Sequence, residues 1–340
     1  MEPEAIDRTE CGSDTSACHT PDSDPPAAPI ERAKLGITPT CWRNADFPDI
    51  GERIAPADII GGIRACTATV SGAEVRYRGT SLAPYFHEPE LNLLRKPPRP
   101  IELTEPWVST FYTEHGGAER TLRDFEKLRT YFGDRRLPLR RLGVAEFGNA
   151  VHLEPDTPLS ERPRFSQRQW ESLVTGLNDL GERCRKDGIE LCYHPHMGTG
   201  VQSQSDMDRL MAATDTKSVK LLLDTGHLTW AGGDPVAAVR RHGRRIRHVH
   251  LKNVSPDIVR DARRSDYSFR TAVEKGVFTV PGEQGAVDFP AVIDELRRVG
   301  YDGEWLVVEA ERNLSNVDEG NRYAQTALAF LAGLGLGACP

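Results

Sequence analysis

Short apolar runs alternate with longer amphipathic stretches along nearly the whole chain from residue 34 onward. This alternation is typical of βα units, in which helices connect the strands of a parallel sheet. Eight such units follow one another, and no glycine-rich dinucleotide-binding motif comes after the first strand. Because an open dinucleotide-binding sheet would carry that motif, the pattern predicts an α/β fold of the closed (β/α)8 TIM barrel type.

The eight expected strands are short, as buried parallel strands usually are. They cover residues 35–41, 73–77, 101–109, 141–147, 189–193, 219–224, 246–251 and 305–309. The expected helices cover 56–66, 88–96, 118–132, 166–186, 203–214, 235–242, 289–299 and 318–331, with a broken helical segment at 255–275. The apolar periodicity is poorest in the second unit, between residues 55 and 100.

Residues 1–33 differ in composition from the rest of the chain. They are acidic, rich in proline and serine, and almost free of large apolar residues, which predicts a disordered extension. Residues 34–340 are then expected to form a single catalytic barrel domain. Cys11 and Cys18 could join His19 around a metal, but no fourth ligand stands at a recognised spacing, so we expect no metal site there.

The overall composition argues against several classes of function. A net charge of −7 and a pI near 5.9 give no general attraction to nucleic acid or anionic lipid. The mean hydropathy is −0.48, and no apolar run approaches the ~20 residues of a membrane span. The seven cysteines are scattered along the chain, so we expect them to be reduced thiols. The N-terminus lacks the features of a signal peptide. We therefore expect a cytoplasmic enzyme with neither nucleic acid nor membrane as a partner. The composition is compatible with a homo-oligomer.

Four of the expected strands end in side chains that bind metals, which are His194, Asp224, His250 and Glu309. The C-terminal ends of all strands of a parallel barrel open onto one face, so residues far apart in the sequence converge there. An imidazole and carboxylate set of this kind suits one divalent ion, Mn²⁺ first and otherwise Co²⁺, Zn²⁺ or Fe²⁺, with positions left open for substrate oxygens. The alternative is that these residues are hydrogen-bonded polar groups at the rim of the barrel.

The two His-x-His pairs need separate assignments. His250 is preferred over His248 as a metal ligand because it lies nearer the C-terminal end of its strand. In the other pair we assign His194 to the metal and His196 to the substrate or to proton transfer, although these two roles can be exchanged.

Further carboxylates and a histidine are expected on the same face. His227 follows Asp224 by three residues and suits a contact with a substrate hydroxyl. Glu146 ends the fourth strand, and Glu311 lies two residues beyond Glu309. Either carboxylate could serve as a general base or a ligand, and Glu311 could replace Glu309.

One lysine and several tryptophans complete the expected substrate site. Lys252 lies two residues beyond His250 and could stabilise a developing enolate, although a solvated lysine is an equal interpretation. Trp42, Trp107 and Trp230 each lie near a strand end and would supply apolar walls, unless they belong to the core.

Several stretches resemble one known family, the xylose isomerase-like barrels, and within it the myo-inosose-2 dehydratases. They are GITPTCWRNADFPDIG, YHPHMGTGVQ, RLMAAT, LLLDTGHLTWAGGDP, RIRHVHLKNV, GVFTVPG and GEWLVVEAE. The resemblance implies a divalent-metal enzyme, often with Mn²⁺ or Co²⁺, that acts on a small polyhydroxylated cyclic ketone. By position, Asp224, His250 and Glu309 match the metal-binding residues of the family. His194 falls where the broader family usually has a glutamate, a departure that the dehydratase subgroup shares.

The resemblance implies elimination of water from inosose through a metal-stabilised enolate. A base, His196 or a nearby glutamate, would remove the α-proton, and an acid, His227 or Glu146, would protonate the departing hydroxyl. Two alternatives stay open, which are an isomerase or epimerase with the same metal site and a catalytically weak subunit that binds a partner. Asn253 and Pro195, which replace the aspartate and histidine expected from the family, motivate the second alternative.

Overall fold

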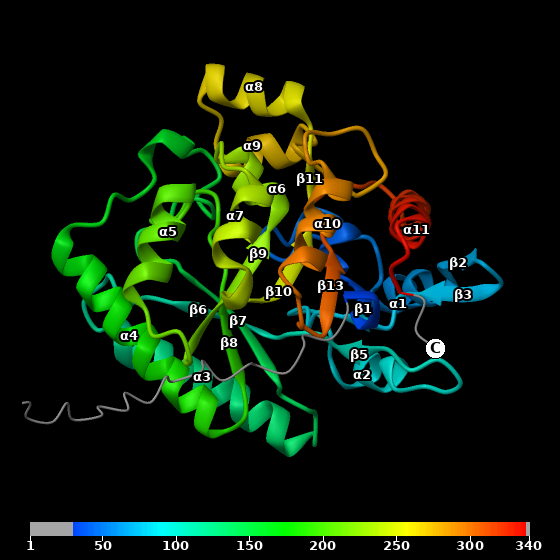
Figure 1. The fold of residues 1–340 in the computed structure, drawn as a ribbon, viewed down its shortest axis with the longest axis horizontal. Coiled ribbons are helices and arrows are strands. Elements are labelled where there is room, and N and C mark those ends of the chain that lie inside the picture. Colours follow the sequence, from blue (N-terminus) through cyan, green and yellow to red (C-terminus); the bar gives the residue numbers. More distant parts are fainter. Residues whose placement is uncertain (1–29, 338–340) are drawn as a thin grey trace, which may run out of the picture.

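The computed structural model describes residues 30–337, which form a curled sheet of parallel strands surrounded by helices (Figure 1). The predicted disordered extension lies outside these residues except at its end, where Ile30–Arg32 form a 3₁₀ turn and Ile30 is buried. Cys11, Cys18 and His19 also lie outside the described range. The division of the chain into an extension and one catalytic domain stays a prediction.

Nine strands within the described range form one parallel sheet with the order β5-β4-β1-β13-β10-β9-β8-β7-β6. In chain order they are β1 (Lys34–Ile37), β4 (Gly79–Thr80), β5 (Glu102–Leu103), β6 (Trp107–Thr110), β7 (Arg141–Glu146), β8 (Glu190–Tyr193), β9 (Val219–Asp224), β10 (Ile246–Leu251) and β13 (Trp305–Val308).

The segment from β5 to β6 closes this sheet into a barrel. It is a single strand interrupted before Pro106, a residue with no N–H to donate. The N–H of Thr104 donates to the carbonyl of Thr80 at 3.0 Å, and the N–H of Gly143 donates to the carbonyl of Pro106 at 3.0 Å. The segment therefore bonds β4 on one side and β7 on the other, and the predicted (β/α)8 barrel is confirmed.

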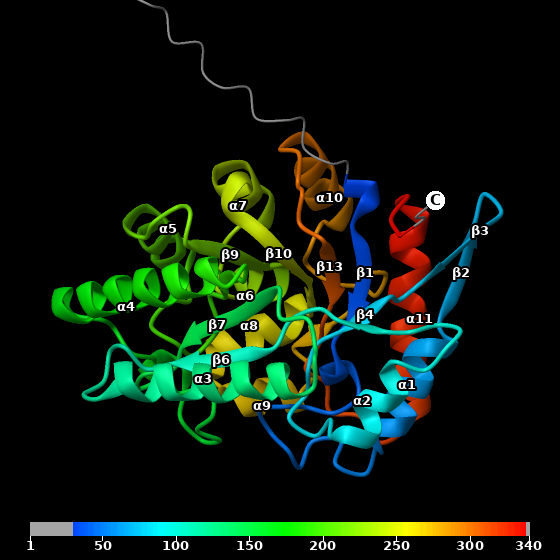
Figure 2. The same ribbon diagram turned by 90° about the horizontal axis from the view of Figure 1, so that it is seen from below.

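Most of the helices cover the outside of the barrel, and the two between residues 256 and 274 lie at one end of it (Figures 1 and 2). They are α1 (Pro56–Ala65), α2 (Glu88–Leu94), α3 (Gly117–Asp134), α4 (Gln167–Lys186), α5 (Gln204–Ala213), α6 (Thr225–Trp230), α7 (Pro235–His242), α8 (Pro256–Ser265), α9 (Phe269–Glu274), α10 (Phe289–Arg298) and α11 (Val317–Gly333). In α4, for example, Leu173, Leu177 and Leu180 recur at helical spacing and are buried against the barrel. None of the helices within residues 30–337 has the length and apolar character of a membrane span.

The second unit differs from its prediction. The strand expected at 73–77 is β3 (Ala73–Arg76), which pairs antiparallel with β2 (Thr67–Val70) and lies outside the barrel, beside α11 (Figure 2). Ser71 and Gly72 both have positive φ values, 52° and 82°, as a tight two-residue hairpin turn requires. The barrel strand of this unit is the two-residue β4, which is too short to show any periodicity in the sequence.

Two further elements near the C-terminal end of the barrel were not predicted. The short helix α6 begins directly after β9, and Oδ1 of Asp224 caps it by accepting the N–H of His227 at 2.8 Å. The hairpin of β11 (Asn253–Val254) and β12 (Phe278–Thr279) follows β10. Both elements bring loop residues close to the ends of the barrel strands.

Candidate metal centre

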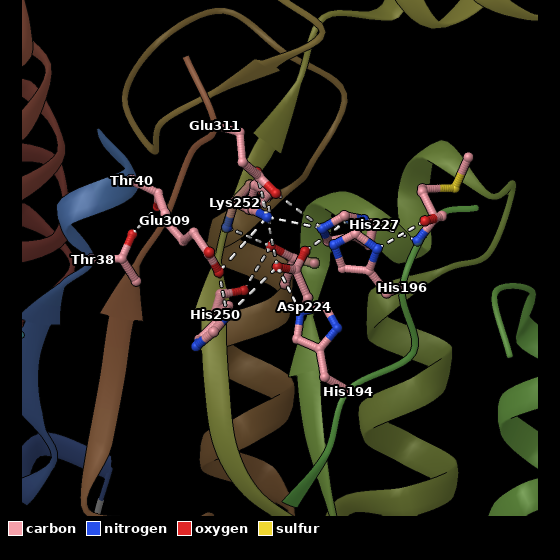
Figure 3. Close-up of polar contacts among 12 residues, drawn as sticks. Thr38, Thr40, His194, His196, Asp224, His227, His250, Lys252, Glu309 and Glu311 are labelled. Atoms are coloured by element: carbon pink, nitrogen blue, oxygen red, sulfur yellow. Dashed lines mark hydrogen bonds and ion pairs between the residues drawn. The ribbon is translucent and has the colours of Figure 1, made fainter. Parts of the chain in front are cut away.

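His194, Asp224, His250 and Glu309 lie together at the C-terminal end of the barrel (Figure 3). They belong to the four adjacent strands β8, β9, β10 and β13 or directly follow them, which explains their convergence. One potential ligand atom of each residue lies within 4.8 Å of those of the other three. Two ligands ~2.1 Å from the same ion lie at most about 4.2 Å apart, so small side-chain shifts would bring this group around a metal.

The contacts within this group leave several buried atoms without a hydrogen bond of normal geometry. Nε2 of His194 lies 3.4 Å from Oδ2 of Asp224, and Nδ1 of His250 lies 3.8 Å from the same oxygen and forms an ion pair with Oε2 of Glu309. Within the described residues, Asp224 Oδ2, His250 Nδ1 and Glu309 Oε2 have no hydrogen bond of normal geometry. Buried polar atoms of this kind are costly unless they are satisfied, and a bound cation would satisfy all three.

Glu105 supports His250 from the side opposite the cluster. It lies between β5 and β6, is only 4% exposed, and contacts Nε2 of His250 at 3.3 Å and Nε2 of His248 at 2.9 Å. Because a carboxylate can only accept, Nε2 of His250 carries a proton, and Nδ1 is the nitrogen that faces Asp224 and Glu309. This carboxylate–histidine arrangement is the usual support of a metal-binding imidazole. His248 contacts the other carboxylate oxygen of Glu105 and forms a further group with Glu105 and His250, so the preference for His250 as the ligand stays a prediction.

The electrostatics of the group favour a bound cation. Burial would raise the pKa of Glu309, but His250 and Lys252 hold it below its ordinary value, and Lys252 and His227 do the same for the pKa of Asp224. Burial would lower the pKa of His250, yet the neighbouring Glu309 and Glu105 raise it to about 10. The carboxyl groups are therefore ionised, and in the absence of an ion a proton on His250 partly compensates them.

His196, His227 and Glu311 form a second group beside the first, again with potential ligand atoms within 4.8 Å of one another. Nδ1 of His196 donates to the carbonyl of Met197 at 2.8 Å, so its Nε2 is an unprotonated acceptor in the neutral ring. The N–H of Met197 donates to Nδ1 of His227 at 3.3 Å, and Nζ of Lys252 lies 3.0 Å from its Nε2, so both ring nitrogens of His227 face a donor. Burial, with His227 nearby, holds the pKa of His196 well below its ordinary value.

Lys252 lies between the two groups. Its side chain is fully buried, and Nζ lies 2.7 Å from Glu311, 3.2 Å from Asp224 and 3.7 Å from Glu309. Lys252 is absent from the described side chains that line the adjoining cavity. The ammonium is thus enclosed by carboxylates, and the predicted contact between Lys252 and a substrate does not fit this position.

A cavity of about 780 Å³ adjoins both groups, a size typical of small-molecule sites. His194, His196, His227, His250, Glu309 and Glu311 line one part of it, and Thr38, Thr40, Asp46 and Ser109 are among its other polar lining residues. Trp107 lines the cavity as predicted and packs edge-on against His194, with ring centroids 5.7 Å apart. The cavity thus joins hydroxyl-bearing and charged side chains to apolar walls.

Three other predicted residues lie away from this cavity. Glu146 is buried and accepts hydrogen bonds from the N–H groups of Tyr112, Thr113 and Gly148 and from the hydroxyls of Thr110 and Thr113. Its carboxylate holds the loop after β6, which does not fit its predicted role as the acid. Trp42 is buried and donates to Asn321 in α11 at 3.0 Å, and Trp230 packs against Phe269 and Phe278. Both tryptophans therefore belong to the core.

The sequence interpretation missed three residues near the cavity. Glu105 was hidden inside an expected strand, whose interruption at Pro106 turns it toward His250. Asp46 lines the cavity, where burial and the charges of Glu311 and Glu309 raise its pKa to about 7. His152 follows β7 in a loop and packs against Phe147 and His196, with ring centroids 4.1 and 4.9 Å away. Only the position of Glu105, next to a proline in an apolar strand, offered any signal.

Comparisons with known proteins add to this geometry. A family model described as "Xylose isomerase-like TIM barrel" matches residues 140–334. The inosose dehydratase of Geobacillus thermodenitrificans is 37% identical over 285 residues, which are 83% of this chain and 91% of that protein. Two crystal structures share the fold at low identity. The probable 3-DHS dehydratase AsbF from Bacillus anthracis has a TM-score of 0.61 at 16% identity and covers 88% of this chain and 98% of its own. The IOLI protein, solved with a zinc atom, has a TM-score of 0.60 at 14% identity, with coverages of 89% and 98%.

Proposed function

The chain belongs to the xylose isomerase-like TIM barrel family, and we propose that it is a divalent-metal-dependent hydro-lyase that removes water from inosose. The observation that carries this proposal is the convergence of His194, Asp224, His250 and Glu309 at one end of the barrel, beside a cavity lined by polar groups. The similarity to inosose dehydratases over most of the chain supports a polyhydroxylated cyclic ketone as the substrate.

The four converging residues would hold the ion, with Mn²⁺ as the first choice and Co²⁺, Zn²⁺ or Fe²⁺ as alternatives. A bound divalent ion would act as a Lewis acid toward the ketone oxygen and so make the neighbouring α-proton more acidic. The contact with Glu105 orients the imidazole of His250 so that Nδ1 faces Asp224 and Glu309, where an ion would bind.

His196 is the base in this proposal. Its Nδ1 is occupied by the carbonyl of Met197, so the free lone pair is on Nε2, and the residue lines the cavity. Burial keeps the pKa of His196 well below its ordinary value, so the ring is neutral but weakly basic at ordinary pH. The acidity that a bound ion would give the α-proton would therefore drive the transfer.

His227 is the acid. Its Nε2 lies 3.6 Å from Oε1 of Glu311 and 3.0 Å from Nζ of Lys252. In the acid role the ring is an imidazolium whose charge Glu311 stabilises, and the proton that it gives to the departing β-hydroxyl leaves a neutral imidazole behind. Each such proton transfer contributes typically 10²–10⁴-fold, so most of the acceleration depends on the ion and on fixed geometry.

The test is to incubate the metal-loaded protein with scyllo-inosose and to follow the absorbance of the cyclohexane-dione that forms after water is lost. The proposal predicts an absorbance change that disappears when a chelator removes the ion and returns when the ion is restored. In deuterated water, deuterium in a substrate that keeps all its hydroxyls would instead identify an isomerase or epimerase. No reaction by a folded, metal-loaded chain would reject both enzymes and favour a partner-binding subunit.

A further inference from the structure

The buried position of Lys252 calls for an explanation, since an ammonium group is rarely taken fully out of water. Its Nζ contacts Glu311 at 2.7 Å, Nε2 of His227 at 3.0 Å and Asp224 at 3.2 Å, and it lies over the ring of Phe278, 4.5 Å from the centroid. A buried charge is tolerated only when partners of opposite charge surround it. The carboxylates around Nζ meet that condition.

The surroundings of the ammonium have the composition of a metal site. His227 and Glu311, together with His196, place ligand atoms within 4.8 Å of one another, as the first group does. Asp224 is shared, because its Oδ2 faces both His194 of the first group and Nζ of Lys252. The side chain of Lys252 thus ends between imidazole and carboxylate groups that could ligate a second ion.

We propose that the ammonium of Lys252 is a built-in cation that fills a second cation position, so that the centre takes one divalent ion and not two. Asp224, Glu309 and Glu311 carry three negative charges, which one divalent ion and one ammonium together balance. Removal of the ammonium leaves the second group uncompensated and opens room for another ion, ligated by His196, His227 and Glu311. The inference rests on the proposed function only in assuming that the first group binds a metal.

The experiment counts the ions bound per chain after equilibrium dialysis of the full-length protein against Mn²⁺, and in parallel against Zn²⁺. The parent chain should hold one ion and Lys252→Ala two. Adding Glu311→Gln to the alanine variant should return the count to one, because it removes a ligand of the second position alone. As a matched control, Lys220→Ala removes a lysine whose Nζ donates to the carbonyl of Thr216 in the loop before β9, and it should hold one ion.

The outcomes separate this inference from the proposed function. A parent chain without any bound ion would refute the metal site on which the proposed function depends. One ion in the parent and one in Lys252→Ala would overturn only the role of Lys252, as would two ions in the parent. If Lys252→Ala folds only when Mn²⁺ is added, as followed by circular dichroism, the ion replaces the ammonium and the inference is supported. An alanine variant that stays unfolded at saturating Mn²⁺ would overturn it.

Discussion

Gly226 is the residue on which the path of the Lys252 side chain most directly depends. A Cβ atom at this position in α6 would lie 2.6 Å from Cγ of Lys252 and 2.9 Å from its Cβ and Cδ. Atoms cannot approach so closely, so an alanine would force Lys252 or α6 to move. The glycine thus leaves the space in which the lysine stem reaches the carboxylates.

We expect Gly226→Ala to lower the free energy of unfolding by about 1–3 kcal/mol, the usual cost of overpacking a core. Chemical denaturation of the variant and the parent would measure this difference in the free energy of unfolding. Gly61→Ala in α1 is the control, because a Cβ there meets nothing within 4 Å and alanine favours a helix by roughly 0.5–1 kcal/mol. A Gly226→Ala chain as stable as the parent would show that the close contact is relieved without strain.

His152 should make the free energy of unfolding depend on pH. Burial, with His227 close by, lowers its pKa to about 3, and within the described chain neither ring nitrogen has a hydrogen-bond partner. An unfolded histidine titrates near pH 6.5, so the neutral form that the fold requires is fully favoured above that pH. As the pH falls below about 6, the unfolded state binds a proton that the folded state rejects, and stability is lost.

The expected loss is up to ~1.4 kcal/mol for each pH unit below about 6. His152→Phe, which keeps an aromatic ring without a titrating group, should remove this part of the slope. The measurement is the free energy of unfolding of both chains at several pH values between 7 and 4. Parallel pH profiles for the parent and the variant would contradict this explanation.

At the scale of the element, Asp224 joins β9 to α6 and to the candidate metal centre. Its Oδ1 caps the helix by accepting the N–H of His227, while its Oδ2 faces His194 and Lys252. One carboxylate therefore fixes the start of the helix and supplies a charge to the site. The two contributions can be separated, because asparagine caps helices as well as aspartate does.

Asp224→Asn and Asp224→Ala should both lose the bound ion, since each removes the negative charge. The alanine variant should also be less stable than the asparagine variant by about 1 kcal/mol, because it alone loses the cap. Metal analysis and thermal unfolding of the two chains would test these points together. Equal stability of the two variants would mean that the cap contributes nothing to α6.

Prediction from the sequence worked best for elements whose pattern is local and long. The amphipathic stretch of α4, with its Ser166 cap, and the apolar runs of β9 and β10 lie within a residue or two of their predicted bounds. The strand β4 and the helix α6 were not predicted, because β4 has two residues and α6 has six, which is too few to show a periodicity. The sequence around β3 also does not indicate whether this strand joins the barrel or packs on α11.

The meeting of His194, Asp224, His250 and Glu309 could be predicted because the ends of parallel strands share one face of a barrel. The direction of Lys252 could not, since it follows the last residue of β10 and depends on the local turn into β11. The burial of Glu146 under five hydrogen bonds could not be predicted either, because its partners come from the end of β6 and the loop after it, more than thirty residues earlier, and from Gly148. The roles of His194, Asp224, His250 and Glu309 as ligands, of His196 as base and of His227 as acid stay predictions.

At the scale of the whole molecule, a closed barrel brings together imidazole and carboxylate groups that lie between residues 105 and 311 in the sequence. We propose that an ion held there makes a cyclic polyhydroxy ketone lose water. The most direct measurement is the rate of dione formation from inosose while Mn²⁺ is titrated into the metal-free chain. The rate should rise in proportion to the ion bound and level off at one ion per chain. Full activity in the metal-free chain, or no activity at saturation, would contradict the claim.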